Sequence, residues 1–388
     1  MNKQPSVALR NKHLNLKNLD LSSAEFPLEH IDINKYEGIQ KDIPLFENNS
    51  LQDIKFISKW FQVLNIARGC TQRCSFCIRC SEYPVKEVDN KISTILWEDL
   101  IRFTDGFSSL GERLGFNPLK GNSHLVLFED ANLPDARIKD INGQIHNTRE
   151  CIEQVWNKLR MPFILVTSGW FLNDNFAQST AEEICNFMVK NPTSIKEFGI
   201  SVNPFYMGDR DYYTSKVANA IKTFLPIFKN GNEQGVILIK YNRPDGIKAD
   251  TTGIEETTKL YNEIYSKLKD MTACSLDDFE ILKPENVTRH SDDKYILNRG
   301  NARNYFQQDE VEKYNKQIQE ESEKWSKMSQ TEKYAHAYEN TTKNINIDGK
   351  IYLVTPSEQV INTKLSLNYI NKNKIAAPVY SDAEFDTL

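Results

Sequence analysis

The sequence predicts an α/β fold built from strand–helix units. Short apolar runs of strand length alternate with longer segments that favour helix, and this alternation is typical of parallel βαβ units. The predicted strands are 61–66, 124–130, 163–168, 198–203, 235–241 and 279–283. The first predicted helix starts at Ser93, which would be its N-cap. The other predicted helices cover 148–160, 180–190, 213–228 and 253–269. The carboxyl ends of such strands are where polar residues should be examined first.

Three regions follow from the composition. Residues 1–58 are polar and interrupted by prolines, so we interpret them as an N-terminal extension packed on the outside of the next domain. The strand–helix units occupy 59–285. Residues 286–388 form a C-terminal extension, in which 307–339 is charged and helix-favouring and 345–354 has a β-hairpin pattern with an Asp-Gly turn. We expect this extension to act as a lid over the substrate site.

Composition and charge restrict the class of protein. The 388 residues include 39% hydrophobic and 26% charged residues, which is ordinary for a globular protein large enough to have a sizeable core. A formal net charge of −5 does not favour nucleic acid as a partner. No apolar run is long enough to predict a membrane span. Seven cysteines, four of them clustered, favour a reducing, cytoplasmic location.

The cysteine cluster is the most informative motif. Cys70, Cys74 and Cys77 have the spacing C-x3-C-x2-C and directly follow the first predicted strand, and Cys80 lies three residues beyond. Thiolates are the ligands of iron–sulfur clusters and of many zinc sites. A structural zinc site usually has two separated CxxC pairs, and no second pair follows downstream. Two readings remain, an open site with three ligands or a closed site that also uses Cys80.

The spacing, the position after the first strand and the aromatic Phe76 before Cys77 resemble the signature of the radical S-adenosylmethionine (SAM) superfamily. The resemblance implies a partial (β/α)6 TIM-like barrel. It also implies that the three cysteines bind three irons of a [4Fe–4S] cluster while the fourth iron binds SAM. Reductive cleavage of SAM would give a 5′-deoxyadenosyl radical that abstracts hydrogen from a substrate C–H bond. The alternative from another class is an electron-transfer or structural metal protein that uses all four clustered cysteines.

The same resemblance assigns roles to residues near the predicted strand ends. Acidic residues after the second strand would bind the SAM amino group, in place of the family's Gly-Gly-Glu segment. Hydroxyl and amide groups after the third and fourth strands would bind the ribose and carboxylate, although these residue types also cap helices. The candidate cofactor-binding residues are Phe76, Glu129, Asp130, Ser168, Ser201, Asn203 and Ile237.

Substrate contacts are predicted where polar residues end or follow the later strands. Tyr206, Lys240 and His290 should face the mouth of the barrel, where they would contact the substrate. Each could equally be a polar residue that only stabilises the fold. The hairpin-bearing extension favours a peptide or natural-product precursor as the substrate; a small metabolite or nucleotide is the alternative. No cysteine follows Cys274, so we expect one cluster. The chemistry also needs a reducing partner such as flavodoxin or ferredoxin.

Overall fold

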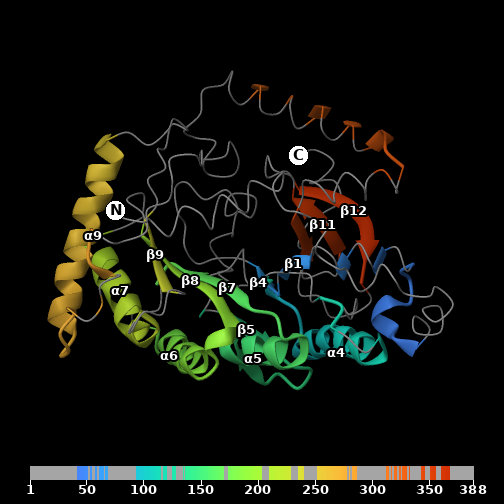
Figure 1. Ribbon diagram of the computed structural model, residues 1–388, viewed down its shortest axis with the longest axis horizontal. Coiled ribbons are helices and arrows are strands. Elements are labelled where there is room, and N and C mark those ends of the chain that lie inside the picture. Colours follow the sequence, from blue (N-terminus) through green and yellow to red (C-terminus); the bar gives the residue numbers. More distant parts are fainter. Residues whose placement is uncertain are drawn as a thin grey trace, which may run out of the picture.

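A computed structural model describes most of the chain between residues 42 and 367 (Figure 1). The residues that it leaves undescribed are 1–41, 51–52, 55–56, 59–60, 65, 69–92, 115–116, 120–124, 128–133, 135, 170–173, 203–208, 229–234, 240–250, 278, 280–281, 286–311, 314–315, 317–318, 321–322, 325, 330–331, 333–341, 346–349, 355–359 and 368–388.

An eight-stranded sheet organises the fold, with the strand order β12-β11-β10-β1-β4-β7-β8-β9. Its strands are β1 (Phe61–Leu64), β4 (Leu125–Leu127), β7 (Phe163–Thr167), β8 (Ile195–Val202), β9 (Gly235–Ile239), β10 (Thr342–Ile345), β11 (Lys350–Val354) and β12 (Val360–Ser366). All neighbours from β10 through β1 to β9 are parallel. The β10–β11 and β11–β12 pairs are antiparallel.

Helices connect the parallel strands and cover one face of the sheet. They are α4 (Trp97–Leu114), α5 (Thr148–Leu159), α6 (Asn175–Lys190), α7 (Arg210–Thr223), α8 (Leu225–Phe228) and α9 (Thr251–Met271). Figure 1 shows α4, α5, α6 and α7 side by side along this face, with α9 packed against α7. The predicted α/β class, with parallel strands joined by helices, is therefore confirmed. Among the described residues, no helix is both long and apolar enough to cross a membrane.

The main core lies between the sheet and the helices. Alternate strand residues, such as Phe163, Leu165 and Thr167 of β7, are buried, as expected when one face of a strand packs against a layer of helices. In β8, the ring of Phe198 lies 4.3 Å from that of Phe224, measured between ring centres, which fixes β8 against the end of α7. Val166, on the alternate position of β7, remains 40% exposed. The two faces of the sheet therefore differ, and the face away from the helices is the more open one at β7.

A short segment before β1 packs on α4. The 3-10 helix η3 (Pro44–Phe46) contributes Phe46, whose ring makes an edge-to-face contact with Phe107 at 5.2 Å between ring centres. Leu45 fills the space above Gly106, because a Cβ at Gly106 would come within 2.4 Å of the Leu45 Cδ2 atom. A glycine inside α4 therefore permits the close approach of this segment.

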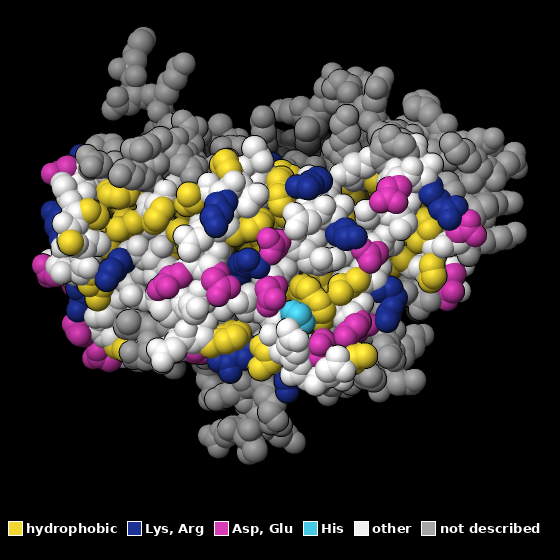
Figure 2. All heavy atoms as spheres, turned by 90° about the horizontal axis from the view of Figure 1, so that it is seen from below, with side chains coloured by type: hydrophobic (Ala, Val, Ile, Leu, Met, Phe, Trp, Pro, Cys, Tyr) yellow, Lys and Arg dark blue, Asp and Glu magenta, His cyan; other side chains and the backbone are white. Residues whose placement is uncertain are grey.

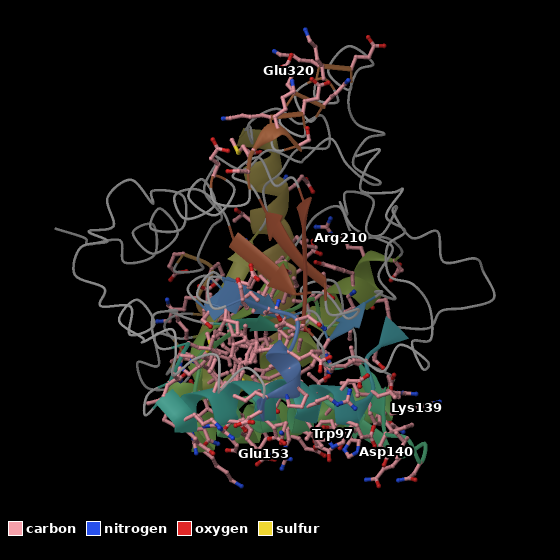
Figure 3. The ribbon with its side chains drawn as sticks, turned by 90° about the vertical axis from the view of Figure 1, so that its right-hand side faces the viewer. Trp97, Lys139, Asp140, Glu153, Arg210 and Glu320 are labelled. Carbon is pink, nitrogen blue, oxygen red and sulfur yellow. The ribbon has the colours of Figure 1, made fainter. Side chains whose placement is uncertain are left out.

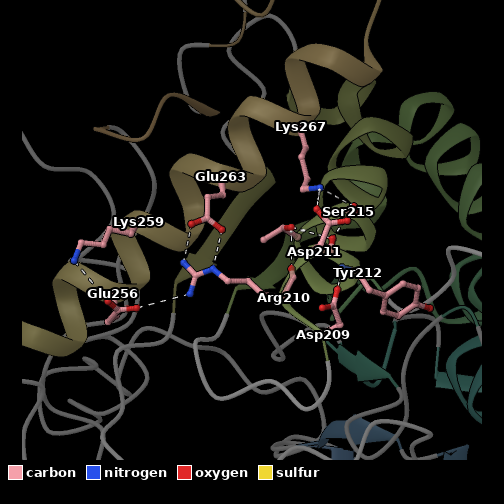
Figure 4. Close-up of polar contacts among 10 residues, drawn as sticks. Asp209, Arg210, Asp211, Tyr212, Ser215, Glu256, Lys259, Glu263 and Lys267 are labelled. Carbon is pink, nitrogen blue, oxygen red and sulfur yellow. Dashed lines mark hydrogen bonds and ion pairs between the residues drawn. The ribbon is translucent and has the colours of Figure 1, made fainter.

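Charged side chains join α7 to α9 (Figure 4). Arg210 donates two hydrogen bonds to Glu263, at 2.8 and 2.9 Å, and Lys267 pairs with Asp211 at 2.6 Å. The hydrogen bond from Arg210 lowers the pKa of Glu263. This pair thus adds stability above the usual carboxyl range, and that contribution is lost as the pH falls through the folded-state pKa. Both side chains of the pair are nearly half exposed, so we expect the pair to contribute at most about 1 kcal/mol.

Two predicted helix starts are wrong. Ser93 is not an N-cap, because Ser93–Thr94 form strand β3, which pairs antiparallel with β2 (Ala67–Arg68), and α4 starts at Trp97. Helix α6 begins at Asn175, five residues before its predicted start. Its cap is Asp174, whose side chain accepts hydrogen bonds from the backbone N–H groups of Phe176 and Ala177. Strand pairing therefore sets the first boundary, and a side-chain cap sets the second.

The predicted sixth strand, 279–283, is wrong. Phe279 and Leu282 instead belong to a turn, in which the N–H of Leu282 donates to the Phe279 carbonyl at 2.9 Å. The Leu282 carbonyl accepts a hydrogen bond from the hydroxyl of Tyr261 on α9, at 2.7 Å. The sixth parallel strand is β10, which lies beside β1. The C-terminal hairpin, β10 and β11, was predicted, but it belongs to the main sheet.

One hairpin was not predicted. Strands β5 (Arg137–Lys139) and β6 (Ile145–Asn147) form a two-stranded sheet between β4 and α5. It packs beside the start of α4, where the rings of Trp97 and His146 stack 4.1 Å apart. Figure 3 shows Trp97, Lys139 and Asp140 close together on the helix side of the sheet. Figure 2 shows acidic and basic side chains interspersed over the face seen from below, without a large area of one sign.

Candidate functional site

The carboxyl ends of five neighbouring parallel strands meet at one edge of the sheet. Strands β1, β4, β7, β8 and β9 are adjacent and run in the same direction. The segments that follow them therefore leave the sheet at this same edge, which is where open parallel sheets bind ligands. Most of the predicted candidates come from these segments, whereas Ser201 and Ile237 lie within β8 and β9, and His290 comes after α9 in the sequence. The segments that follow these five strands are far apart in the sequence, and the topology makes them start at the same edge of the sheet.

The two ends of the segment with the clustered cysteines are paired with each other. It follows β2 and ends at β3, which pairs with β2 through Ala67 opposite Thr94 and Arg68 opposite Ser93. The N–H of Ile95 also donates to the Ile66 carbonyl at 3.1 Å, and both residues are buried. Residues 69–92 therefore leave and return at adjacent points just beyond β1. A loop anchored in this way suits a metal centre, because its donors all come from one short stretch.

Most of the predicted site residues lie outside the described part of the chain. They are Cys70, Cys74, Phe76, Cys77, Cys80, Glu129, Asp130, Asn203, Tyr206, Lys240 and His290. Ser168, Ser201 and Ile237 lie within it. Within the described residues, no group of three or more His, Cys, Asp and Glu side chains could hold a metal ion.

Ser168 lies in a tight turn at the end of β7. The preceding Thr167 is buried, and its hydroxyl accepts a hydrogen bond from the N–H of Gly169 at 3.2 Å. Gly169 has φ 76°, and a Cβ there would lie 2.8 Å from the Cβ of Ala220 on α7. The turn is thus fitted closely to α7. Ser168 does not cap α6, since Asp174 does so.

Ser201 and Ile237 occupy different faces of the sheet. Ser201 lies between Ile200 and Val202, which are both buried, and it is in register with Leu238 of β9. It does not cap α7, because Asp209 fills that role with a hydrogen bond from the Tyr212 N–H at 2.8 Å. Ile237 is in register with Ile200. Because faces alternate along a strand, these two register positions lie on opposite sides.

Sequence reasoning missed the residues that shape the turn after β7. Thr167, Gly169 and Ala220 form its hydrogen bond and its contact with α7. A glycine directly after a polar strand end is the signal that could have identified the turn, because glycine readily adopts positive φ. The helix partner has no comparable signal in the sequence.

The three cysteines outside the cluster lie on different parts of the fold. Cys151 lies in α5 and Cys185 in α6, and both are buried, whereas Cys274 is exposed beyond α9. Burial raises the pKa of Cys151 well above its usual value and raises the pKa of Cys185 to about 12. Their thiols therefore stay protonated near neutral pH and behave as small apolar groups.

This difference predicts selective alkylation. At pH 8, only about one in ten thousand Cys185 thiols would be ionised, so iodoacetamide should label Cys274 in the folded protein and should label Cys151 and Cys185 only after unfolding in urea. Peptide mass mapping before and after unfolding measures the three sites separately. Labelling of Cys185 as fast as Cys274 in the folded protein would contradict the burial described above.

Comparisons with known proteins returned no match, whether with protein-family models, with curated proteins or with solved structures. The case for a function therefore depends on the sequence motif and on the place that the fold gives it.

Proposed function

We propose that this protein is a radical SAM enzyme whose single [4Fe–4S] cluster is held by Cys70, Cys74 and Cys77. One observation carries the proposal. The C-x3-C-x2-C motif begins just beyond the carboxyl end of a parallel strand, on a segment whose two ends are joined by the β2–β3 pair. The donor set fits the group, because three thiolates can hold an iron–sulfur cluster with one iron left for SAM.

The proposed architecture is a partial (β/α)6 barrel. It is supported by the five parallel strands β1, β4, β7, β8 and β9, which are neighbours in sequence order, and by the helices on one face. The sixth parallel strand, β10, lies beside β1 and not beside β9. In such a barrel the face away from the helices lines the interior. The partly buried Ser201 and the exposed Val166 belong to that face.

The chemistry that the cluster supplies when bound is one-electron reduction of SAM, which yields methionine and a 5′-deoxyadenosyl radical that abstracts hydrogen from the substrate. The chain's own residues bind and orient the reactants. Glu129 and Asp130 would accept hydrogen bonds from the SAM amino group, and Phe76 would lie against the adenine. Ser168, Ser201 and Asn203 would complete the SAM site. Ile237, predicted to contact the adenine, is in register with Ile200, on the side of the sheet opposite to Ser201, so we leave it out of the proposed site.

The proposed substrate is a peptide or natural-product precursor, with a small metabolite or nucleotide as the alternative. Tyr206 and Lys240, which follow β8 and β9 in the sequence, would contact it. The prediction for His290 depended on a strand at 279–283, and that segment has a turn instead. A flavodoxin or ferredoxin would supply the electrons. The C-terminal extension would shape the substrate site, and its strands β10 to β12 continue the sheet directly beside β1.

Anaerobic reconstitution with iron and sulfide tests the proposal. We expect about four irons per chain, as one [4Fe–4S] cluster requires, and 5′-deoxyadenosine when SAM and a strong reductant are added. Iron near eight per chain, or S-adenosylhomocysteine as the main product, would contradict it. A bound metal without any SAM cleavage would favour the closed four-cysteine site instead.

A further inference from the structure

A lysine of α7 is completely buried. Lys216 has no exposed surface, whereas Lys222 on the same helix is exposed. The Lys216 Nζ atom lies 4.9 Å from the centre of the ring of Tyr213, which is itself only 4% exposed. Burying an ammonium group is costly unless polar or charged groups around it compensate, so fully buried lysines are rare. A methionine would fill a similar volume without this cost, so packing alone does not explain a lysine here.

The buried lysine lies at the part of α7 that contacts the turn after β7. A Cβ at Gly169 would lie 3.4 Å from the Lys216 carbonyl oxygen and 2.8 Å from the Ala220 Cβ. Helical side chains lean toward the N-terminus of their helix, and the contact of Lys216 with Tyr213, one turn earlier, agrees with this direction. Since α7 follows the carboxyl end of β8, the ammonium is directed toward the edge of the sheet where the candidate site lies.

We propose that Lys216 is a positioning residue, whose buried ammonium fixes the Thr167–Gly169 turn against α7 and so sets the place of Ser168. The role of Ser168 in binding SAM rests on the function proposed above. The positioning itself does not, because it follows from the burial of Lys216 and from the close fit of Gly169 to α7. Loss of the charge should loosen the turn and weaken SAM binding, while the chemical step remains.

The test compares Lys216→Met, which keeps the length but not the charge, with Lys216→Arg, which keeps the charge. Lys222→Met is the matched control on the exposed side of the same helix. Hydrogen exchange of the peptide that spans residues 163–174 reports on the turn without cluster or SAM. In Lys216→Met we expect about tenfold faster exchange at Gly169, which corresponds to the loss of about 1.4 kcal/mol in the free energy of opening.

Kinetically, we expect the KM for SAM to change while kcat does not. In reconstituted Lys216→Met, the KM for SAM should rise about tenfold while kcat stays within about twofold, because binding and not chemistry is affected. Lys216→Arg should restore part of the loss, and Lys222→Met should match the unsubstituted protein. Unchanged exchange in Lys216→Met, or an unchanged KM despite faster exchange, overturns the proposal.

A second variant covers the case in which Lys216→Met does not fold. In Gly169→Ala the new Cβ would be too close to Ala220 of α7, so the turn would have to move away from the helix. This variant should therefore also raise the KM for SAM. An unchanged KM in that variant also overturns the proposal. If the unsubstituted protein makes no 5′-deoxyadenosine, the function proposed above fails, while hydrogen exchange still decides whether Lys216 holds the turn. Faster exchange in Lys216→Met than in Lys222→Met and in the unsubstituted protein supports that role, and equal exchange in all three overturns it.

Discussion

Replacing any one of Cys70, Cys74 and Cys77 with alanine is expected to abolish SAM cleavage. Under the proposed function, each substitution removes one of only three thiolates that hold the cluster, and the residues that the structure describes contain no metal-binding group that could replace it. We expect the yield of 5′-deoxyadenosine to fall by more than about a hundredfold. Loss of a residue that only hydrogen-bonds to a metal ligand already costs up to about a hundredfold in metal affinity or activity, and loss of a direct ligand should cost more. Chromatographic measurement of the product, together with iron content per chain, checks this.

Two further variants make this result specific. Cys80→Ala should keep iron and SAM cleavage near the level of the unsubstituted protein, since under the proposal Cys80 is not a ligand. Cys274→Ser is the matched control outside the cluster, because Cys274 is exposed and distant in sequence. Equal loss of iron in all four clustered variants would favour a closed four-cysteine site and would refute the radical SAM mechanism.

Local sequence patterns were sufficient to predict most of the elements around the site. The strands at β1, β4, β7, β8 and β9 were predicted because each is a short apolar run, and α5, α7 and α9 because each is a longer helix-favouring segment between such runs. The helix starts were less accurate. Ser93 is a plausible cap by residue type, yet its backbone pairs with β2, a partner that no local pattern reveals.

Two kinds of feature could not be predicted, namely strands too short to show a pattern and features that depend on contacts with distant parts of the chain. The strands of the β5–β6 hairpin are three residues long, too short for a periodic signal. The sixth parallel strand comes from residue 342 onward, far in the sequence from its neighbour β1. The burial of Lys216 likewise results from the packing of α7 against other elements, and nothing in the sequence distinguishes it from the exposed Lys222. Of the candidate site, the sequence predicted the motif and the strand ends but not the turn at Gly169.

The place of β10 in the sheet leads to the second large effect. Ile345 of β10 is paired with Leu64 of β1 on one side and with Ile351 of β11 on the other. Because both neighbours are strands, a proline at this position removes a donor from within the sheet and leaves a partner carbonyl unpaired. We expect Ile345→Pro to lower the free energy of unfolding by about 3 kcal/mol or more. Chemical denaturation followed by circular dichroism measures the change.

The same variant should also impair the cysteine site, because β1 leads through β2 into the segment that carries Cys70. After reconstitution, Ile345→Pro should hold clearly less iron per chain than Ile345→Val, which keeps the backbone donor and the β-branched shape of the side chain. If the proline and valine variants were equally stable, the place of β10 between two neighbouring strands would be contradicted. If the proline variant were unstable but still bound iron fully, the cysteine segment would not depend on the strand that precedes it.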